Sequence, residues 1–261
     1  MSILRYADCM SFKILVSGST GAVGQNLLDV IANSPRFDLA GQANRRSFFE
    51  PDDEGDAIID FSHPVLLEQT VAHALRHRTP LVIGTTGLDD ELNERIRRAA
   101  ETIPICQDAN FSLGIHLLEH LASVAAGALN TDFDIEISEA HHRRKLDAPS
   151  GTALALGRTL AKTLGIDAEE SLVTDRTRHR IPRGGREIGY QVLRGGDIVG
   201  EHTVHFLGPG ERLELTHRAQ DRSVFARGAL RAARALCGRG PGLIGFDDLM
   251  LADNSTAYFS R

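Results

Sequence analysis

The sequence contains few cysteines and no tryptophan. Three cysteines, Cys9, Cys106 and Cys237, occur in 261 residues, and they lie far apart without a C-x-x-C pair. An odd and sparse set of this kind excludes a disulfide framework and a cysteine-based zinc site, and it is typical of a reducing compartment. We therefore expect a cytoplasmic protein.

A basic excess and long apolar runs are also missing. The formal net charge is −6, whereas nucleic-acid-binding proteins usually carry excess positive charge. No apolar run reaches the roughly 18 residues that span a membrane, and the first ten residues include Asp8 and lack the apolar core of a secretory signal. We expect neither a nucleic-acid partner nor a membrane partner. At 42% hydrophobic and 25% charged, the composition fits one large or two modest globular domains.

The sequence offers one pair of histidines at helical spacing. His116 and His120 lie one turn apart in a helix predicted from Gly114 to Leu129. A zinc site needs further ligands, and no H-E-x-x-H motif is present. We therefore expect packing or surface roles for both histidines, and no bound metal.

A glycine-rich turn lies near the start of the chain. It follows a predicted strand, Phe12 to Ser17, and precedes a helical pattern that stops near Pro35. The glycines fall in the pattern G-x-x-G-x-x-G. Gly18 permits a tight turn, Gly21 a close approach of a pyrophosphate, and Gly24 the packing of helix on strand. No Gly-Lys-Ser/Thr follows, so the turn predicts a dinucleotide site rather than a P-loop.

The second predicted strand, Phe37 to Ala43, leads directly into Asn44, Arg45 and Arg46. In dinucleotide-binding folds an acidic residue at this point contacts the ribose hydroxyls, while arginine accommodates a 2′-phosphate. The sequence therefore favours NADPH over NADH. The alternative is that both arginines are ordinary surface charges.

Strands and helices continue to alternate up to about Cys106, which predicts a parallel doubly wound sheet. Ligands of such sheets bind beyond the carboxyl ends of the strands. Phe61, Gly84 to Thr86, and Asn110 with Phe111 fall at such ends, so we expect them to border the cofactor.

The pattern changes after this sheet. Phe133 to Glu139 alternates apolar and polar residues, as a half-buried strand does, and Gly185 to Arg194, Ile198 to Leu207 and Glu211 to His217 read as antiparallel strands. We expect a Rossmann-like dinucleotide-binding domain of residues 1–112 and 223–261. The remaining part, residues 113–222, is predicted to be an α+β domain with a mixed or antiparallel sheet for substrate binding and oligomerisation.

A basic cluster lies between that alternating strand and the next helix. His141, His142, Arg143, Arg144 and Lys145 are consecutive, and a Pro-Ser-Gly-Thr turn that can open a helix follows at residues 149–152. Backbone N–H groups at a helix N-terminus bind anions, and histidine exchanges protons near neutral pH. The cluster predicts a cradle for a carboxylate or phosphate; a solvated charge run with a serine N-cap is the alternative.

The stretch from Glu139 to Ala153, E-A-H-H-R-R-K-L-D-A-P-S-G-T-A, resembles the signature E-x-H-H-x-x-K-x-D-x-P-S-G-T-A of bacterial dihydrodipicolinate reductases, now called 4-hydroxy-tetrahydrodipicolinate reductases. The glycine-rich turn matches this family too. So do three further blocks, in family order: I-G-T-T-G from Ile83, N-F-S-x-G from Asn110 and G-D-I-V-G-E-H from Gly196. The resemblance covers nearly all of the chain from Phe12 to about Leu251.

The resemblance implies an oxidoreductase of lysine and diaminopimelate biosynthesis, which reduces a cyclic dicarboxylate to tetrahydrodipicolinate with NAD(P)H and forms a homotetramer through the second domain. It implies that His141 supplies a proton and Lys145 stabilises charge. The substrate carboxylates are expected to contact His142, Lys145, Gly151 and Thr152. Together with the strand ends, it predicts these cofactor-binding residues: Gly18, Gly21, Ala22, Val23, Gly24, Asn44, Arg45, Phe61, Gly84, Thr85, Thr86, Asn110 and Phe111.

Three features depart from the family pattern. Asn44 replaces the acidic residue of many members, the segment from Asn44 to Asp60 is short, and His116 replaces an asparagine. Two other functions are compatible with the fold alone: a diverged NAD(P)H-dependent reductase of an imine or amino acid, and a non-enzymatic nucleotide sensor. Neither requires His141 and Lys145 together.

Overall fold

The computed structural model describes residues 11–178 and 182–250. The chain divides into two compact units, one formed by Met1–Ser112 with Arg222–Arg261 and the other by Leu113–Asp221. Among the described helices, none combines the length and the apolar character needed to cross a membrane.

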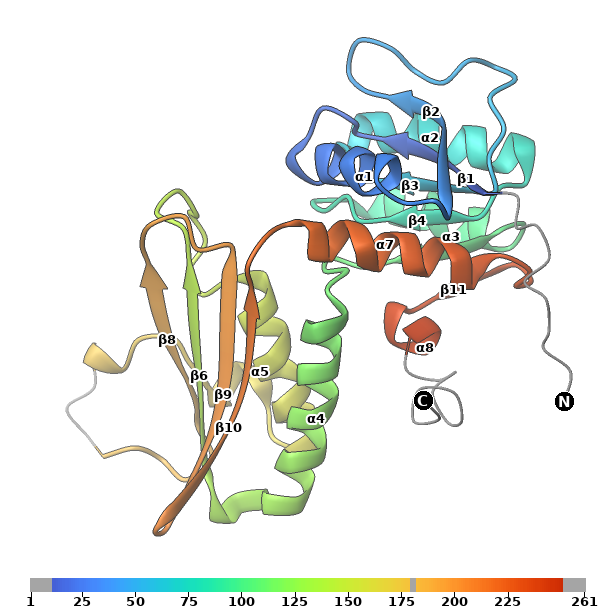
Figure 1. The fold of residues 1–261 in the computed structure, drawn as a ribbon. Helices are drawn as coiled ribbons and strands as arrows, with labels where there is room; N and C mark the ends of the chain where they lie inside the picture. The colour runs from blue at the N-terminus through green and yellow to red at the C-terminus, as the bar shows by residue number, and fades with distance from the viewer. Residues whose placement is uncertain (1–10, 179–181, 251–261) are drawn as a thin grey trace, which may run out of the picture. The chain divides into compact units, whose positions relative to one another are not determined.

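The first unit is built on a sheet of six parallel strands in the order β11-β5-β4-β3-β1-β2 (Figure 1). The strands are β1 (Phe12–Ser17), β2 (Phe37–Ala43), β3 (Ala57–Asp60), β4 (Leu81–Ile83), β5 (Pro104–Gln107) and β11 (Gly242–Ile244). The parallel doubly wound sheet is therefore confirmed. The edge strand β11 was not predicted, because three residues are too few to show a period.

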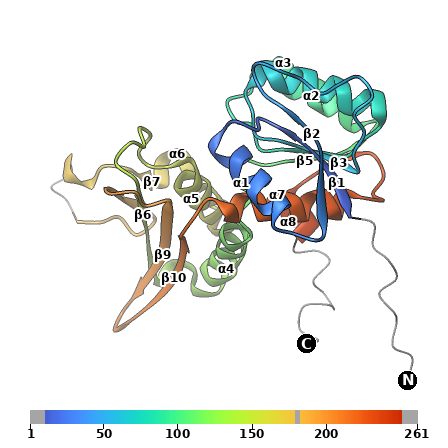
Figure 2. The same cartoon turned by 45° about the horizontal axis from the view of Figure 1, so that its top comes forward.

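Helices cover both faces of this sheet (Figure 2). One face packs against α1 (Ala22–Ala32), α7 (Ser223–Leu236) and α8 (Phe246–Met250), and the other against α2 (Pro64–His77) and α3 (Asp90–Ala100). Neighbouring residues of β1 serve opposite faces: Ile14 and Val16 pack in the first core, and Leu15 packs in the second. Burial on both faces explains the continuous apolar runs of these strands.

The second unit contains a five-stranded sheet in the order β10-β9-β6-β8-β7. Its strands are β6 (Asp134–His141), β7 (Leu172–Val173), β8 (Ile188–Arg194), β9 (Gly200–Gly208) and β10 (Glu211–Ala219). The antiparallel prediction holds for β9 and β10 but is wrong for β8, which runs parallel to β6. A helix lies between β6 and β8 in the chain, and such a crossover returns the chain in its original direction.

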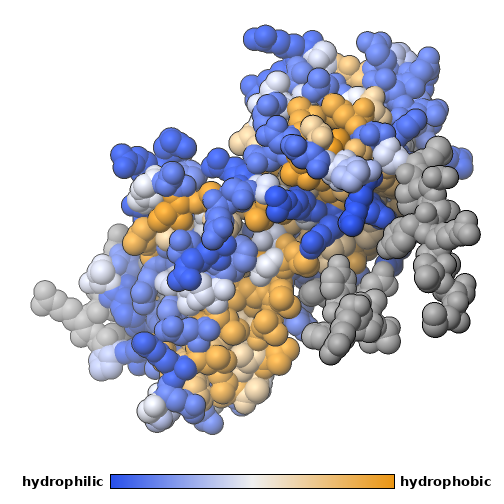
Figure 3. Space-filling model, viewed as in Figure 1, coloured by the Kyte–Doolittle hydropathy of each residue, from blue (hydrophilic) through white to orange (hydrophobic). Residues whose placement is uncertain are grey.

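Two long helices cover one face of this mixed sheet: α4 (Leu113–Leu129) and α5 (Gly151–Leu164). The shorter elements are η1 (Asn130–Asp132), α6 (Ala168–Ser171) and η2 (Arg176–Arg178). On the outer side of α4, Leu117, Leu121 and Val124 are 44%, 45% and 58% exposed. They contribute to the apolar surface over α4 in Figure 3.

Candidate active site

The glycine-rich turn joins β1 to α1 in the first unit. Gly18 has φ +84°, and a Cβ there would lie 2.2 Å from the carbonyl oxygen of Phe61. A Cβ on Gly24 would lie 2.1 Å from the carbonyl oxygen of Gly18, so both positions require glycine. Gly21 is the N-cap of α1 and supplies no side-chain cap. The turn therefore presents backbone N–H groups at Ala22 and Val23 to an anion.

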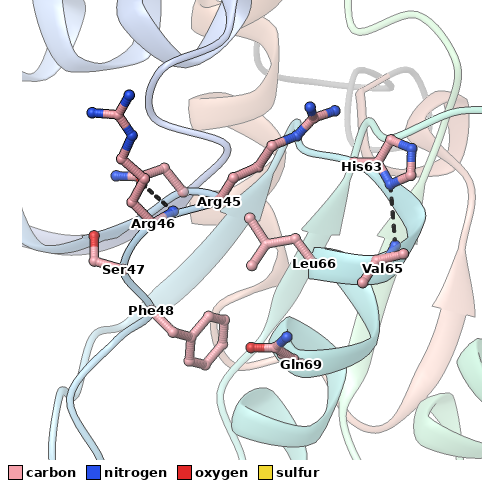
Figure 4. A pocket seen from close by; sticks show the side chains of 9 residues that line it. Arg45, Arg46, Ser47, Phe48, His63, Val65, Leu66 and Gln69 are labelled. Carbon is pink, nitrogen blue, oxygen red and sulfur yellow. Dashed lines mark hydrogen bonds between the residues drawn. The ribbon is translucent and has the colours of Figure 1, made fainter.

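A second turn, after β2, presents the two arginines. The Asn44 side-chain oxygen accepts a hydrogen bond from Arg46 N at 2.9 Å, and Asn44 N donates to the Ser47 carbonyl at 2.8 Å. Asn44 is thus a structural residue of this turn. A cleft of about 580 Å³ lies between the turn and α2, and Figure 4 shows Arg45 extending on the side of His63. The lining residues of this cleft are Asn44, Arg45, Arg46, Ser47, Phe48, His63, Val65, Leu66 and Gln69.

A cavity of about 280 Å³ shares Asn44, Arg45, His63 and Leu66 with this cleft and extends to the glycine-rich turn. Gly18, Thr20, Gly21, Phe61 and Ser62 complete its lining. A glycine turn at one end and arginines at the other fit a dinucleotide with its pyrophosphate and adenosine ends. Sequence reasoning missed His63, whose Nδ1 accepts a hydrogen bond from Val65 N at 3.4 Å; the following proline at the start of α2 was the available signal.

The other predicted cofactor residues mainly shape the strand ends. Thr85 Oγ1 donates to Asp60 Oδ1 at 2.5 Å and accepts from Ser62 N at 2.7 Å. A Cβ on Gly84 would lie 2.1 Å from the Phe61 ring. Phe111 is fully buried, ring and backbone together, so none of its atoms is exposed to a cofactor in this structure. Three more positions lie away from both cavities: Thr86 on the surface, Gly24 in the core and Asn110 in a turn that accepts from Ser112 N.

The second site forms at the carboxyl end of β6. Ile135, Ile137, Glu139 and His141 alternate along the strand and share its buried face. Glu139 and His141 thus lie on the same face of β6 as the isoleucines that pack in the core. The register places His202 of β9 opposite Glu139. On the other side, β8 ends at Arg194.

Glu139 is the centre of this group, and its side chain is fully buried. Arg194 donates to both carboxylate oxygens at 2.7 Å, and Ser150 N donates to Oε1 at 3.0 Å. His141 Nδ1 lies 2.6 Å from Oε2. Burial raises the pKa of Glu139, but the hydrogen bonds from Arg194, His141 and Ser150 outweigh it, so the pKa lies below its ordinary value.

The two buried histidines of this site have lowered pKa values. Burial lowers the pKa of His141; the hydrogen bond and charge of Glu139 oppose this change, whereas Lys145 and Arg194 add to it. Burial and then the charge of His141 lower the pKa of His202 to about 3. The two rings meet edge to face with centroids 5.2 Å apart. His202 is therefore neutral near pH 7.

Lys145 belongs to the loop that joins β6 to α5. Its Nζ lies 2.9 Å from Oδ2 of Asp147. The pKa of Asp147 is lowered, first by the hydrogen bond from Lys145 and also by the N–H of Gly151. Ser150 caps α5 by accepting from Ala153 N at 3.2 Å. Two predicted anion-binding groups, Lys145 and Gly151, thus already hold a carboxylate.

The remaining predicted residues lie in the same loop and helix end. His142 follows His141, and its buried Nδ1 has no hydrogen-bond partner among the described residues. Gly151 and Thr152 form the first turn of α5. Sequence reasoning gave no role to Arg194 or His202, and named Glu139 only as part of a motif. The alternation of β6 was a signal for Glu139, because Glu139 faces the same side of the strand as Ile135 and Ile137.

The fold and these sites define a class of protein. A doubly wound sheet with a glycine-rich turn and an arginine-lined cleft forms one unit. A mixed sheet that holds a histidine, a buried carboxylate and a lysine forms the other. The class is that of nicotinamide-dependent oxidoreductases.

Comparisons with known proteins agree with this assignment to a class. The family descriptions "Dihydrodipicolinate reductase, N-terminus" and "Dihydrodipicolinate reductase, C-terminus" match residues 12–111 and 114–250. Proteins named 4-hydroxy-tetrahydrodipicolinate reductase from Thiobacillus denitrificans and Halorhodospira halophila are each 40% identical to this chain, and each comparison covers 92% of this chain and 99% of the relative. The chain belongs to the dihydrodipicolinate reductase family, as its motifs predicted.

A solved structure has the same fold. It is titled a dipicolinate-bound dihydrodipicolinate reductase from Paenisporosarcina sp. TG-14 and is 22% identical in sequence. The superposition has a TM-score of 0.74 and covers 93% of this chain and 100% of that chain. The likeness confirms the predicted fold class.

Proposed function

We propose that this chain reduces the cyclic dicarboxylate derived from 4-hydroxy-tetrahydrodipicolinate to tetrahydrodipicolinate with NAD(P)H, in the cytoplasmic synthesis of diaminopimelate and lysine. The names of its relatives support this activity, and the dipicolinate in the related structure supports a dicarboxylate substrate. One observation carries the proposal. His141, held by a buried carboxylate, lies at a strand end from which the loop carrying Lys145 leads to a helix N-terminus.

NAD(P)H, when bound, would supply a hydride to the conjugated imine that forms when the 4-hydroxy compound loses water. Addition of the hydride leaves an electron pair on the substrate ring, and one proton is needed to neutralise it. His141 delivers that proton, a contribution of about 10²–10⁴ in rate for a well-placed general acid. Lys145 lies close in sequence and places a fixed positive charge beside the negative charge that develops.

The substrate carboxylates are proposed to bind where the Asp147 carboxylate now lies. Asp147 is an internal stand-in, because its oxygens contact Lys145 and the N–H of Gly151. His142 and Thr152 border the same loop and helix end. When the dianionic substrate displaces Asp147, its charge favours the protonated form of His141 and so prepares the acid.

We propose NADPH as the preferred cofactor. The turn after β2 commits the Asn44 side chain to Arg46 N, which leaves no acidic residue for a ribose 2′-hydroxyl at this position. Arg45 lines both cavities of the first unit and can donate to a 2′-phosphate. The expected contacts are those predicted at the glycine turn, this arginine turn and the strand ends.

A homotetramer built through the second unit is also proposed. The face of its sheet opposite α4 and α5 carries Ser138, Gln191, Leu193 and Thr203 around a shallow cleft of about 330 Å³. Leu193 is 55% exposed there, although it lies within a regular strand. Sedimentation of the full chain tests this assembly, and a monomer at micromolar concentration would contradict it.

The catalytic assignment is tested by two substitutions and two matched controls. His141→Gln and Lys145→Ala should each lower kcat by about 10²–10⁴ while circular dichroism stays that of the native protein. His120→Gln and Lys162→Ala remove exposed residues of the same types from the same unit and should keep kcat. A folded His141→Gln variant with wild-type turnover would refute the assignment.

A further inference from the structure

A buried arginine–carboxylate pair lies directly behind the catalytic histidine. Glu139 has a fully buried side chain, and Arg194 is 18% exposed. Burying two charges costs free energy, and their mutual attraction often does no more than offset this cost. The pair is therefore weak evidence that it stabilises the fold. Its position calls for another explanation.

The contacts of Glu139 fix the tautomer of His141. Both of its oxygens accept from Arg194, and one also accepts from Ser150 N. A carboxylate surrounded by such donors is ionised and can only accept hydrogen bonds. The short contact of 2.6 Å with His141 Nδ1 therefore requires a proton on that nitrogen. The neutral ring then carries Nδ1–H, and Nε2 is the nitrogen that gains and loses the catalytic proton.

Nε2 of His141 also lies beside Gly200 of β9, a position that has no side chain. Residue 200 is glycine, and a Cβ there would lie 3.1 Å from Nε2. His202, the next residue on that face of β9, is instead turned to Ser150, with 3.2 Å between its Nε2 and the serine Oγ. A side chain at position 200 would therefore crowd Nε2, and glycine avoids this.

Arg194 also connects the pair to the loop that carries Lys145. Its Nη2 donates to the carbonyl oxygen of Asp147 at 2.7 Å, in addition to the carboxylate of Glu139. One guanidinium thus joins β8, β6 and the loop before α5. Lysine could not make these contacts together, because it lacks the planar fork of donors.

We propose that Glu139 and Arg194 are positioning residues for the reduction: Glu139 orients His141 so that Nε2 delivers the proton, and Arg194 holds Glu139 and the Lys145 loop in register. This inference rests on the proposed function, in which His141 is the acid. The charged and titratable groups that face His141 are Glu139 on β6, Arg194 on β8, His202 on β9 and Lys145 in the loop.

The sign of the expected pH effect follows from these neighbours. The acid form of His141 is required, so activity falls as pH rises through its pKa. Glu139 raises that pKa, and Glu139→Gln removes the charge while a side-chain oxygen remains to accept Nδ1–H. The variant should therefore lose activity at lower pH than the wild-type enzyme. Its kcat should fall about 10- to 100-fold, the range for a lost charge-assisted hydrogen bond, with both KM values nearly unchanged.

Arg194→Lys should affect the kinetics differently, because it also removes the hydrogen bond that holds the loop carrying Lys145. We expect a lower kcat and a higher KM for the dicarboxylate, with an unchanged KM for the cofactor. Glu136→Gln is the matched control: Glu136 lies on the same strand and pairs with Arg183 at 3.3 Å, away from His141. This control should keep the wild-type rate and pH profile.

A spectroscopic measurement tests the inference without turnover. Nitrogen-15 NMR of histidine-labelled protein distinguishes the two neutral tautomers, and the His141→Gln spectrum identifies the His141 signals. We expect Nδ1–H in the wild-type protein and its loss in Glu139→Ala. An Nε2–H tautomer in the wild-type protein would overturn the inference, as would a Glu139→Gln variant with wild-type kcat and pH profile. Wild-type turnover by His141→Gln would instead refute the role of His141 as the acid, and a wild-type protein that does not oxidise NAD(P)H with the dicarboxylate would refute the proposed function.

Discussion

Acidification should destabilise the fold through one buried histidine, His202. Its pKa is lowered to about 3, chiefly because the ring is buried. In the unfolded chain a histidine titrates near 6.5. Below that pH the unfolded chain takes up a proton that the folded chain refuses, so folding stability decreases as pH falls from about 6.5 towards 3.

The size of the effect follows from linkage. Each pH unit below the unfolded pKa costs about 1.4 kcal/mol per proton, so His202 alone should lower the unfolding free energy by about 2 kcal/mol between pH 7 and pH 5. The folded chain binds almost no proton at this site at pH 5, so the protonation of the unfolded chain sets the size of the effect. The acidic limit of stability is thus set in part at the proposed catalytic site.

Urea unfolding of wild type and His202→Gln at the two pH values measures this contribution. The variant should lose about 2 kcal/mol less than the wild type on acidification, whatever its stability at neutral pH. The matched control is His205→Gln, from the same strand, where 24% of the histidine side chain is exposed. This control should lose as much unfolding free energy between pH 7 and pH 5 as the wild type. Equal losses of unfolding free energy in wild type and His202→Gln would show that His202 does not cause the acid destabilisation.

Three further predictions concern activity. Arg45→Ala should raise the KM for NADPH about 10- to 100-fold and leave that for NADH nearly unchanged; equal losses would contradict a 2′-phosphate contact. Gly200→Ala should crowd the Nε2 atom of His141, since the new Cβ would lie 3.1 Å from it, and kcat should fall with little change in melting temperature. Asp147→Asn removes the carboxylate that occupies Lys145, so the KM for the dicarboxylate should fall; a raised KM would argue against displacement.

The glycine turn and the strand ends could be predicted because their physics is local. Gly18 adopts φ +84°, and a Cβ on Gly24 would meet the Gly18 carbonyl six residues earlier, so both requirements for glycine arise within the turn itself. The parallel direction of β8 could not be predicted in this way. An alternating pattern specifies which residues face the core, but it does not give the direction of the neighbouring strand.

The groups around His141 illustrate the same limit. Arg194 is separated from Glu139 by 55 positions and meets it only because β8 pairs with β6 in one register. Nothing in the local sequence around Arg194 distinguishes it from a surface arginine. Conversely, Phe111 belongs to a recognisable motif, yet its side chain packs between Phe61 and Phe246 in the core. A motif identifies a segment, and packing decides which of its atoms can reach a ligand.

The most direct test of the central claim is nicotinamide oxidation by the full chain. The substrate is made in situ by the preceding synthase from pyruvate and aspartate semialdehyde, and loss of nicotinamide absorbance is followed with NADPH and with NADH. We expect oxidation that depends on the synthase, is faster with NADPH, and is lost in His141→Gln but retained in His120→Gln. Folded wild-type protein that oxidises neither cofactor would contradict it.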